Sequence, residues 1–363
     1  MYDYAIIIHP TSEELLHRYE PGMKYRSSLL VKKVLEWMSP FKAADIIGLR
    51  SDQGGTSKGT LVMCPLLMGQ MITLSPHKVK ASVSATIKFA LELNIKLIGL
   101  TAYTAFSGNK GEDLAKHLNV ALTTGSSYTL GMIPESILRA ADLMNIKLDR
   151  TKILLIGATS SIGKFCIENL AHYTPRIFVT ATTQDKLDLL MAGLPKEKSA
   201  KLQRISDIES VLDQTKIIII ATNRLPVGLN LNKIRPGSIL FDSSYPRRIP
   251  SNIRNDILVV DGVAIKPPGE NVDFNFDFGL PKGLCYPCMA EPMILALEQK
   301  FENYSLGKES EPHKIKEIMR LGAKHGFEIA SLTSQERVIS DEDIIKIKQT
   351  AQKKDLYCCS KNK

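Results

Sequence analysis

The sequence predicts an α/β protein with a doubly wound parallel sheet, and three observations lead to this prediction. First, residues 152–164 read as a buried apolar strand, a turn of small residues and the start of a helix. Second, four more short runs rich in β-branched residues follow, at 177–181, 217–221, 239–241 and 257–260. Third, helical patterns separate these runs, and such alternation is typical of a parallel sheet covered by helices on both faces.

The turn after the first of these strands predicts a nucleotide site. Gly157 and Gly163 occupy the outer positions of a dinucleotide fingerprint, and Ser160 stands where a middle glycine is usual. Small residues let a ligand approach the backbone, and the N-terminus of the next helix offers N–H groups to a pyrophosphate. The alternative is an ordinary tight turn without a nucleotide. The expected contacts are Gly157, Thr159, Ser160, Ser161, Ile162 and Gly163, with the N–H groups of Ser160, Ser161 and Ile162 facing the pyrophosphate.

Length and composition indicate a soluble enzyme of two domains. The chain has 363 residues, of which 44% are hydrophobic and 23% charged. No apolar run approaches the roughly 20 residues that a membrane span needs. The first ten residues lack the basic segment of a signal peptide, so the sequence predicts a cytoplasmic protein with its six cysteines reduced.

The net charge of +9 is spread along the chain together with acidic residues, so no tract for nucleic acid stands out. A basic surface favours an acidic partner. That partner could be a phosphorylated cofactor, an acidic carrier protein or, by peripheral contact, an anionic membrane surface. The alternative is a solvated surface with no specific partner, and charge alone does not decide.

The pattern of strands and helices in residues 1–150 predicts a smaller α/β domain that precedes the doubly wound sheet. Residues 4–8 read as its first strand, and Thr11 with Glu14 three residues later has the spacing of a helix cap. Further strands are expected at 46–49, 60–63, 96–100 and 120–122, and helices at 78–93, 111–118 and 130–144.

A polar turn, residues 123–129, lies between the last of these strands and an apolar helix. A turn rich in hydroxyl groups either caps the helix or binds a carbonyl, phosphate or ribose, and the sequence leaves both readings open. Pro134 is expected in the first turn of the helix. On the second reading, the substrate contacts are Thr124, Gly125, Ser126 and Tyr128.

The end of the strand at 177–181 is where a doubly wound domain contacts the adenosine ribose. An acidic residue there would bind a free 2′-hydroxyl and select NAD. Asp185 lies beyond this position and is expected to start the following helix. Thr182, Thr183 and Lys186 offer hydroxyls and a positive charge that suit a 2′-phosphate, so the sequence favours NADP.

Two later strand ends add polar residues at the same edge of the predicted sheet. Thr222 and Asn223 follow one strand, and Asp242 ends another. Ligands of such sheets bind beyond the carboxyl ends of the strands, so we expect these residues near the cofactor. Asp242 could equally cap the turn that follows it.

Cys288 is the candidate nucleophile. It lies at or just before the N-terminus of an apolar helix, where the dipole depresses the pKa of a thiol. A thiolate beside a nicotinamide site indicates attack on an acyl thioester, followed by hydride transfer that releases an aldehyde. Three alternatives stay open: a redox dithiol with Cys285, half of a zinc site completed by Cys358 and Cys359 or by histidines, and a buried thiol that only packs.

Short motifs in a fixed order over residues 3–330 resemble the long-chain acyl-[acyl-carrier-protein] reductases of cyanobacteria. The family's nucleophilic cysteine falls on Cys288. The matching segments are His9-Pro10-Thr11-Ser12, Thr123-Thr124-Gly125, Ile156-Gly157-Ala158-Thr159-Ser160-Ser161-Ile162-Gly163, Ser244-Tyr245-Pro246, Cys288-Met289-Ala290-Glu291 and Lys324-His325-Gly326-Phe327.

This resemblance implies an NADPH-dependent reductase that forms a fatty aldehyde from an acyl group on a carrier protein or on CoA. The chain departs from the family at Ser160, where the family has a glycine, and at Thr182, where it has a basic residue. Ser127 and Tyr128 also differ from the family's polar turn, and residues after Leu332 have no counterpart.

Two other functions stay open. A dehydrogenase of the shikimate or quinate type would need a Lys–Asp pair in the first domain, and Lys80 has no evident partner in the sequence. The other is a non-catalytic protein that binds NADP for regulation.

The sequence predicts four parts of the chain. These are an acyl domain at 1–150, an NADP-binding domain at 151–280, a nucleophile helix with further helices at 281–335, and a charged tail at 336–363.

Overall fold

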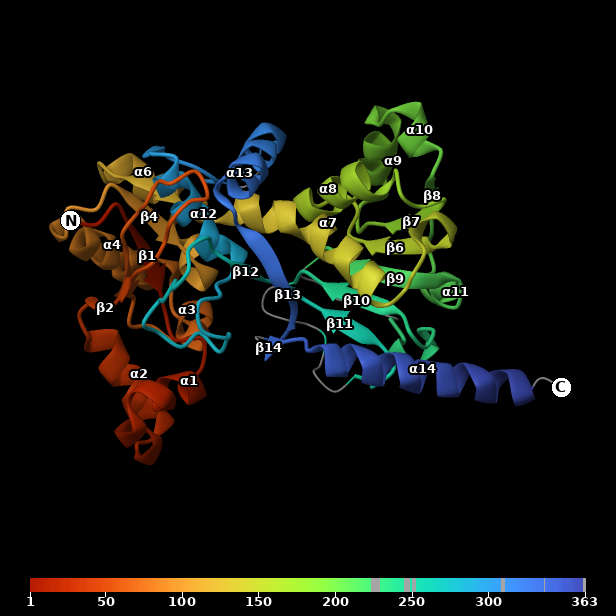
Figure 1. Cartoon of the computed structure of the whole chain (residues 1–363), viewed down its shortest axis with the longest axis horizontal. Helices are drawn as coiled ribbons and strands as arrows, with labels where there is room; N and C mark the ends of the chain where they lie inside the picture. The colour runs from red at the N-terminus through yellow and green to blue at the C-terminus, as the bar shows by residue number, and fades with distance from the viewer. Residues whose placement is uncertain (223–228, 245–248, 250–252, 308–310, 336, 362–363) are drawn as a thin grey trace. The chain divides into compact units, whose positions relative to one another are not determined.

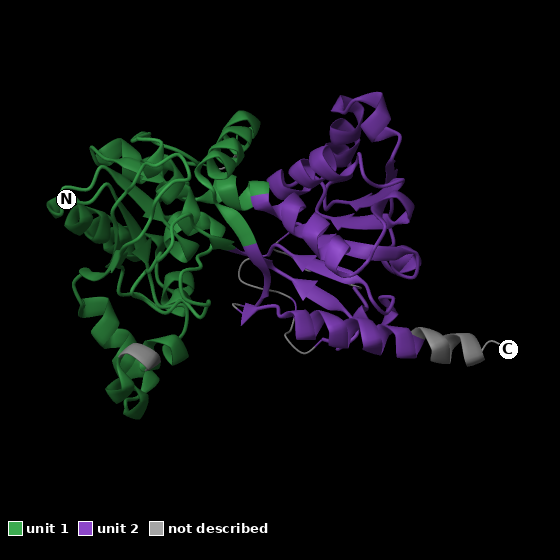
Figure 2. Cartoon of the chain, viewed as in Figure 1, with its two compact units in different colours: residues 1–131, 265–329 green, residues 132–264, 330–363 purple. Residues whose placement is uncertain are grey.

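A computed structural model describes residues 1–222, 229–244, 249, 253–307, 311–335 and 337–361 (Figure 1). The chain forms two compact units (Figure 2). Unit 1 contains residues 1–131 and 265–329, and unit 2 contains residues 132–264 and 330–363. Each unit is therefore built from two separate stretches of chain, and residues 265–329, which carry Cys288, belong to the same unit as the N-terminal strands.

Unit 1 is centred on a five-stranded sheet with the order β2-β3-β1-β4-β5. Only β2 runs antiparallel to its neighbour. A strand was expected at 46–49, but β2 ends at Ile46. Its polar residues and outward-facing side chains fit an edge strand, which the apolar pattern did not reveal. The bounds are β1 Tyr4–Ile8, β2 Phe41–Ile46, β3 Gly59–Met63, β4 Leu97–Leu100 and β5 Ala121–Thr123.

The helices of unit 1 pack their apolar sides on this sheet, around a core drawn from β1, β3, β4, β5 and α4. The cap of α1 is Ser12, whose hydroxyl accepts from the Leu15 N–H at 3.1 Å, so the expected cap at Thr11 is wrong by one residue. The helices are α1 Glu13–Tyr19, η1 Pro21–Tyr25, α2 Ser28–Trp37, α3 Met68–Thr73, α4 Pro76–Glu92, η2 Ala102–Phe106, α5 Ser107–Lys110, α6 Glu112–His117, α12 Pro287–Leu297 and α13 Pro312–His325.

Helix α12 is apolar on all sides, and almost every one of its residues is buried. Gly99 of β4 lets it approach the sheet closely, because a Cβ at this position would lie 2.7 Å from the ring of Pro292. The helix that carries Cys288 is therefore a core element of unit 1 and lies against its central strands.

Unit 2 contains a six-stranded, fully parallel sheet with the order β8-β7-β6-β9-β10-β11. The chain starts at β6, adds strands on one side and then returns to add strands on the other, which is the doubly wound arrangement. The predicted fold class is confirmed. The bounds are β6 Lys152–Ile156, β7 Arg176–Thr180, β8 Leu202–Arg204, β9 Thr215–Ile220, β10 Ile239–Asp242 and β11 Leu258–Val260.

Helix α7, Ser126–Leu143, starts in unit 1 and ends in unit 2. It begins inside the polar turn, so Pro134 lies in its interior and the expectation of a first-turn proline is wrong. A three-stranded sheet also crosses the boundary. The remaining elements are β12 Gly262–Lys266, β13 Glu328–Ser334, β14 Arg337–Val338, η3 Leu148–Arg150, α8 Ser161–Leu170, α9 Gln184–Gly193, α10 Lys196–Ser199, α11 Glu209–Leu212, η4 Leu231–Lys233 and α14 Asp341–Lys361. None of the helices that the structure describes could cross a lipid bilayer.

Candidate functional site

The turn between β6 and α8 packs too closely for side chains at its two glycines. Gly157 has φ +88°, and a Cβ there would lie 2.6 Å from the carbonyl oxygen of Ala221 at the end of β9. A Cβ at Gly163 would lie 2.4 Å from the carbonyl oxygen of Gly157. One glycine thus allows the sharp turn at the centre of the sheet, and the other allows the helix to approach it. These are two of the roles that glycines have in a dinucleotide-binding turn.

Ser160 caps α8 and is not a free pyrophosphate donor. Its hydroxyl accepts from the Gly163 N–H at 2.9 Å, and its own N–H donates to the Gly157 carbonyl at 3.1 Å. The expectation that the Ser160 N–H faces a pyrophosphate is therefore wrong in this conformation. The N–H groups of Ser161 and Ile162 donate to no group that the structure describes. These two donors, at the N-terminus of a ten-residue helix, fit a phosphate ligand.

The polar residues beyond β7 lie in solvent. Thr182, Thr183 and Lys186 are all exposed, and Thr183 precedes α9 without using its hydroxyl as a cap. Asp185 falls in the first turn of α9, as expected. The residues after this strand are therefore open to a ribose or a 2′-phosphate, and no carboxylate occupies the position that selects NAD.

The polar residues at the ends of β9 and β10 differ in how they are placed for contact with a cofactor. Thr222 is half-buried and its Cβ lies 3.0 Å from where a Gly157 Cβ would be, so it lies next to the glycine turn. Asn223 lies outside the described residues. Asp242 is 1% exposed, and its carboxylate accepts from the N–H groups of Ser244 at 2.9 Å and Ile249 at 3.1 Å. This geometry favours the capping reading of Asp242 over contact with a cofactor.

Cys288 lies in unit 1, in the first turn of α12, which begins at Pro287. The residue as a whole is half-buried, and the surroundings of its sulfur are desolvated enough to dominate the pKa of the thiol. Gly125, with φ +70°, lies directly against it, because a Cβ at Gly125 would be 2.4 Å from the Cys288 Cα. The polar turn after β5 and the cysteine therefore meet, although the sequence separates them by more than 160 residues.

The thiol of Cys288 has a raised pKa, so the expected depression by the helix N-terminus is wrong. Burial is the largest effect, and the carboxylate of Glu291 adds to it. The N–H groups of Ala102, Cys288 and Met289 act in the opposite direction, but the balance raises the pKa to about 11. The resting group at neutral pH is consequently the thiol.

Glu291 lies beneath the cysteine, one helical turn along α12, and is fully buried. Its carboxylate accepts from the Thr123 hydroxyl and, at 2.7 Å, from the Tyr128 N–H. Burial raises its pKa in spite of these donors. Sequence reasoning noted Glu291 only as part of the motif after Cys288. The structure shows that it holds the polar turn against α12.

His9, at the end of β1, is buried, and both nitrogens of its ring are engaged. Its Nδ1 lies 3.1 Å from the Pro10 carbonyl, and its Nε2 accepts from the Tyr103 N–H at 3.1 Å. Burial lowers its pKa to about 4, so the ring is neutral at physiological pH. The preceding residue, Ala102, directs its N–H to the Cys288 sulfur. The ends of β4 and β5 thus meet at the cysteine, and the end of β1 is joined to them through the contact of His9 with Tyr103, at the edge of the sheet where ligands of such folds bind.

The predicted substrate residues differ in accessibility. The hydroxyls of Thr124 and Ser126 lie 2.9 Å apart and both donate to the Ser305 carbonyl, at 3.2 Å for Ser126. Tyr128 is 1% exposed, and its ring lies against Gly322 in the interior. Its hydroxyl therefore has no access to a substrate in this conformation. Gly125 is the member of this group in contact with the cysteine.

Two of the three alternatives for Cys288, the redox dithiol and the zinc site, gain little from the described residues, whereas the burial and raised pKa of its thiol are compatible with the third, a thiol that only packs. Cys285 is completely buried, burial raises its pKa, and both cysteines are free thiols. Among the residues that the structure describes, no three His, Cys, Asp or Glu side chains are grouped to hold a metal ion. The side chains of Cys358 and Cys359 lie outside that part of the chain.

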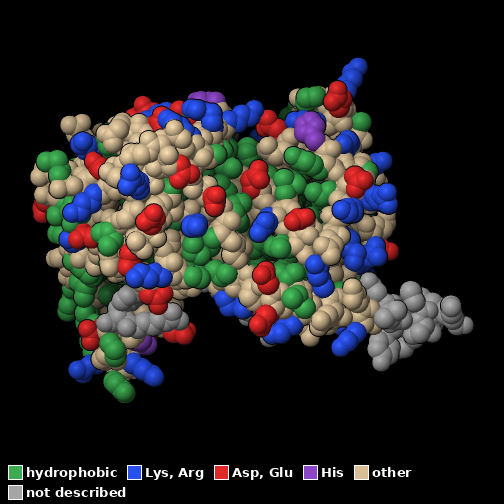
Figure 3. Space-filling model, viewed as in Figure 1, with side chains coloured by type: hydrophobic (Ala, Val, Ile, Leu, Met, Phe, Trp, Pro, Cys, Tyr) green, Lys and Arg blue, Asp and Glu red, His purple; other side chains and the backbone are tan. Residues whose placement is uncertain are grey.

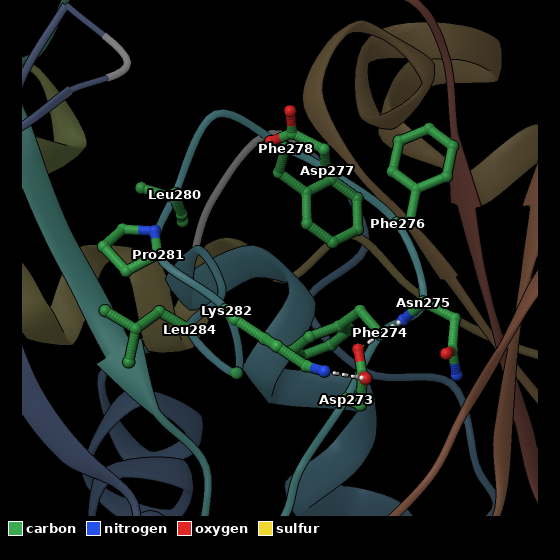
Figure 4. A pocket seen from close by; sticks show the side chains of 11 residues that line it. Asp273, Phe274, Asn275, Phe276, Asp277, Phe278, Leu280, Pro281, Lys282 and Leu284 are labelled. Carbon is green, nitrogen blue, oxygen red and sulfur yellow. Dashed lines mark hydrogen bonds and ion pairs between the residues drawn. The ribbon is translucent and has the colours of Figure 1, made fainter. Parts of the chain in front are cut away.

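A pocket of about 440 Å³ lies in the segment between β12 and α12 (Figure 4). Three phenylalanines surround it, with ring centroids 5.6 Å apart for Phe274 and Phe278 and 5.0 Å apart for Phe276 and Phe278. Lys282 and Asp273 form an ion pair of 2.7 Å at its margin. The pocket is thus lined by both apolar and polar side chains, since Asn275 and Asp277 also face it, and its size is within the usual range for small ligands.

Lys80 has an acidic partner that sequence reasoning did not find. Its Nζ lies 3.8 Å from the Asp113 carboxylate, and both side chains are half-exposed. The residues come from the first turns of α4 and α6. Unit 1 therefore contains a Lys–Asp ion pair at Lys80.

Comparisons with known proteins give matches to three groups. Residues 139–261 match the family model of shikimate / quinate 5-dehydrogenase. The chain is 28% identical over 95% of its length to aminotransferase PigE of Serratia sp., of which it covers 42%. It is 24% identical over 58% of its length to the long-chain acyl-[acyl-carrier-protein] reductase of Synechococcus elongatus, of which it covers 62%. The chain thus spans less than two thirds of either relative.

Solved structures resemble the chain at low identity. Shikimate dehydrogenase of Aquifex aeolicus is 13% identical, with 88% of this chain and 98% of that one covered and a TM-score of 0.37. Quinate dehydrogenase of Corynebacterium glutamicum is 10% identical, with 68% and 81% covered and a TM-score of 0.30. The strand order of unit 2, its glycine turn and the family match over residues 139–261 show that the chain has the α/β fold of NAD(P)-binding dehydrogenases.

Proposed function

We propose that this protein is an NADPH-dependent reductase that converts an acyl thioester to an aldehyde through an acyl group on Cys288. The observation that carries the proposal is the meeting of the β4 end, at Ala102, and the Thr-Thr-Gly turn after β5 at the Cys288 thiol. The partial identity with an acyl-[acyl-carrier-protein] reductase supports it. Carrier protein or CoA would deliver the acyl group.

In the first step, the Cys288 sulfur attacks the thioester carbonyl, and a new C–S bond forms as the bond to the carrier breaks. The thiol proton leaves with the carrier sulfur, so the exchange is neutral in charge. Because the thiolate is the attacking species and the pKa of the thiol is about 11, the proton has to leave the sulfur as the C–S bond forms, and this proton transfer is the demanding part of the step. The N–H groups of Ala102 and Met289, which face the sulfur, are placed to stabilise an oxyanion formed there.

NADPH supplies the hydride that turns the acyl carbon into an aldehyde. Ser161 and Ile162 would hold the pyrophosphate, and Thr182, Thr183 and Lys186 the 2′-phosphate. Release of the aldehyde breaks the C–S bond and returns the thiol. We propose the pocket at 273–284 for the acyl chain, because three phenylalanine rings line one part of it and its segment leads directly into α12 (Figure 4).

Mass spectrometry of the protein incubated with an acyl thioester tests the proposal. We expect one added acyl group on the wild type and on Cys285→Ala, which changes a fully buried thiol. Cys288→Ala should carry none and should still bind NADPH. Addition of NADPH to the labelled wild type should remove the group and release an aldehyde. Equal labelling of Cys288→Ala would overturn the assignment of the nucleophile.

The second candidate function is a dehydrogenase of the shikimate or quinate type, favoured by the family match and by the Lys80–Asp113 pair. It predicts oxidation of a cyclic hydroxy acid with NADP, lost in Lys80→Ala and retained in Cys288→Ala. The thioester reductase predicts the reverse pattern. NADPH binding without either activity would indicate a regulatory protein.

A further inference from the structure

Large apolar side chains project into solvent from the start of unit 1. Tyr25 in η1 is 87% exposed, and Trp37 at the end of α2 is 84% exposed. Leu29 and Leu30 in the first turn of α2 are 68% and 47% exposed. We call Tyr25, Leu29, Leu30, Lys33 and Trp37 the α2 face. An isolated exposed leucine needs no explanation, but a group of this size indicates an interaction site.

The fold of unit 1 uses the opposite side of α2. Val31 and Leu35 are buried and pack with Leu67 in a small core cluster. Leu29, Lys33 and Trp37 are spaced four residues apart and therefore lie along a second stripe of the helix. Packing accounts for the first stripe and leaves the second without a role in the fold.

Basic side chains outnumber acidic ones in η1 and α2 themselves, although the exposed Glu20 directly precedes η1. Lys24, Arg26 and Lys33 are exposed and form no ion pair with any carboxylate that the structure describes. Residues 21–37 contain four basic residues and one acidic residue, Glu36, whose carboxylate accepts from the Gln70 amide at 3.2 Å. The fourth basic residue, Lys32, pairs with Glu13 at 3.4 Å. The local charge complements an anionic surface.

We propose that the α2 face binds the surface of an anionic lipid bilayer. Trp and Tyr favour the boundary between headgroups and acyl chains, and leucines beside them insert while lysine and arginine contact the headgroups. Figures 1 and 3 show α1 and α2 as a projection of unit 1 with hydrophobic and basic side chains together at its tip. A convex tip suits a planar bilayer, whereas the core of a protein interface is depleted in lysine. The proposal does not depend on the function proposed above.

The chain provides its own probe, because Trp37 is its single tryptophan. Vesicles that contain phosphatidylglycerol should shift the Trp37 emission to shorter wavelength and carry the protein into the pellet on sedimentation. Vesicles of phosphatidylcholine alone should do so at least tenfold more weakly. Raising the salt concentration from about 0.1 M to about 0.5 M should release the protein, since the charges are exposed and screened.

Two variants and a matched control locate the surface. Leu29→Ser and Lys33→Glu should each weaken vesicle binding severalfold, and the double variant at least tenfold, with unchanged far-UV circular dichroism. Leu189→Ser changes a leucine of similar exposure, 73%, on α9 and should bind like the wild type. Equal loss in all variants would overturn the assignment, as would an emission shift that needs no lipid and follows protein concentration or added acyl carrier protein.

Discussion

Burial sets the protonation state of two titratable side chains at the carboxyl end of the unit 1 sheet, His9 and Cys288. His9 is neutral because the interior disfavours its cation, and Cys288 is a thiol because the interior disfavours its anion. Both shifts oppose simple expectations from residue type. A histidine beside a cysteine suggests a base, but both nitrogens of His9 are engaged by backbone groups.

His9 makes the stability of the protein depend on pH. Its pKa is about 4 in the folded protein and about 6.5 in the unfolded chain, so the unfolded state binds more protons between these values. The free energy of unfolding should therefore fall by about 3 kcal/mol as pH falls from 7 to 4. Urea unfolding of wild type and His9→Gln at several pH values measures this. The variant should lack this part of the dependence, and parallel curves would contradict the prediction.

Glu291 should control the reactivity of Cys288. Glu291→Gln removes a negative charge that raises the thiol pKa, so the thiolate fraction at pH 8 should increase and iodoacetamide should react severalfold faster. Glu298→Gln is the control, because that carboxylate pairs with Lys324 and His325. Mass spectrometry of the alkylated protein gives both rates. An unchanged rate in Glu291→Gln would mean that Glu291 is already protonated.

At the scale of elements, the glycine turn between β6 and α8 depends on backbone contacts that no other residue allows. Gly157 has a positive φ, and a Cβ at this position would lie 2.6 Å from the carbonyl oxygen of Ala221. Gly193, at the end of α9, has no atom within 4 Å of such a Cβ. An alanine is therefore expected to disturb the backbone at position 157 and to be accommodated at position 193.

Gly157→Ala should displace the turn from β9 and weaken NADPH binding at least tenfold, with a loss of stability of about 1–3 kcal/mol. Gly193→Ala should leave both quantities within error of the wild type. Calorimetric titration with NADPH and thermal unfolding measure them. Equal NADPH affinity in the two variants would show that the turn does not contact the nucleotide.

At the scale of the whole molecule, unit 2 needs the C-terminal part of the described chain. Helix α14 buries Ile344 and Ala351, and Lys354 lies 3.2 Å from Asp256, whose side chain is fully buried. Unit 2 is consequently closed by residues that lie about 80 to 95 positions beyond β11, the last strand of its sheet along the chain.

A chain that ends at residue 340 should therefore lose about 2–4 kcal/mol in the unfolding transition that NADPH stabilises, mainly through the two apolar side chains. A chain that ends at residue 354 keeps all three contacts and should behave like the wild type. Urea unfolding with and without NADPH distinguishes the two. The prediction is wrong if both truncations unfold at the same urea concentration.

The sequence alone was sufficient for the fold class, the glycine turn and the position of Cys288 at a helix start, because these depend on periodicity and on local backbone chemistry. It was misleading about β2, whose edge position hides the apolar pattern, and about the cap at Ser12. It also did not reveal β8, because a short polar strand has no distinct signal. These errors concern elements whose identity depends on their neighbours.

Only the tertiary structure decided the electrostatics of the cysteine. The helix start at Pro287 could be predicted, and Glu291 lies only three residues beyond Cys288. The contact with Gly125, however, comes from a segment more than 160 residues away, and the burial of the sulfur depends on how that segment and the residues after β4 pack against α12. Similarly, the Lys80–Asp113 pair depends on how α4 and α6 lie on the sheet. A pKa or an ion pair is set by the groups that surround it in space, and local sequence carries no information about those groups.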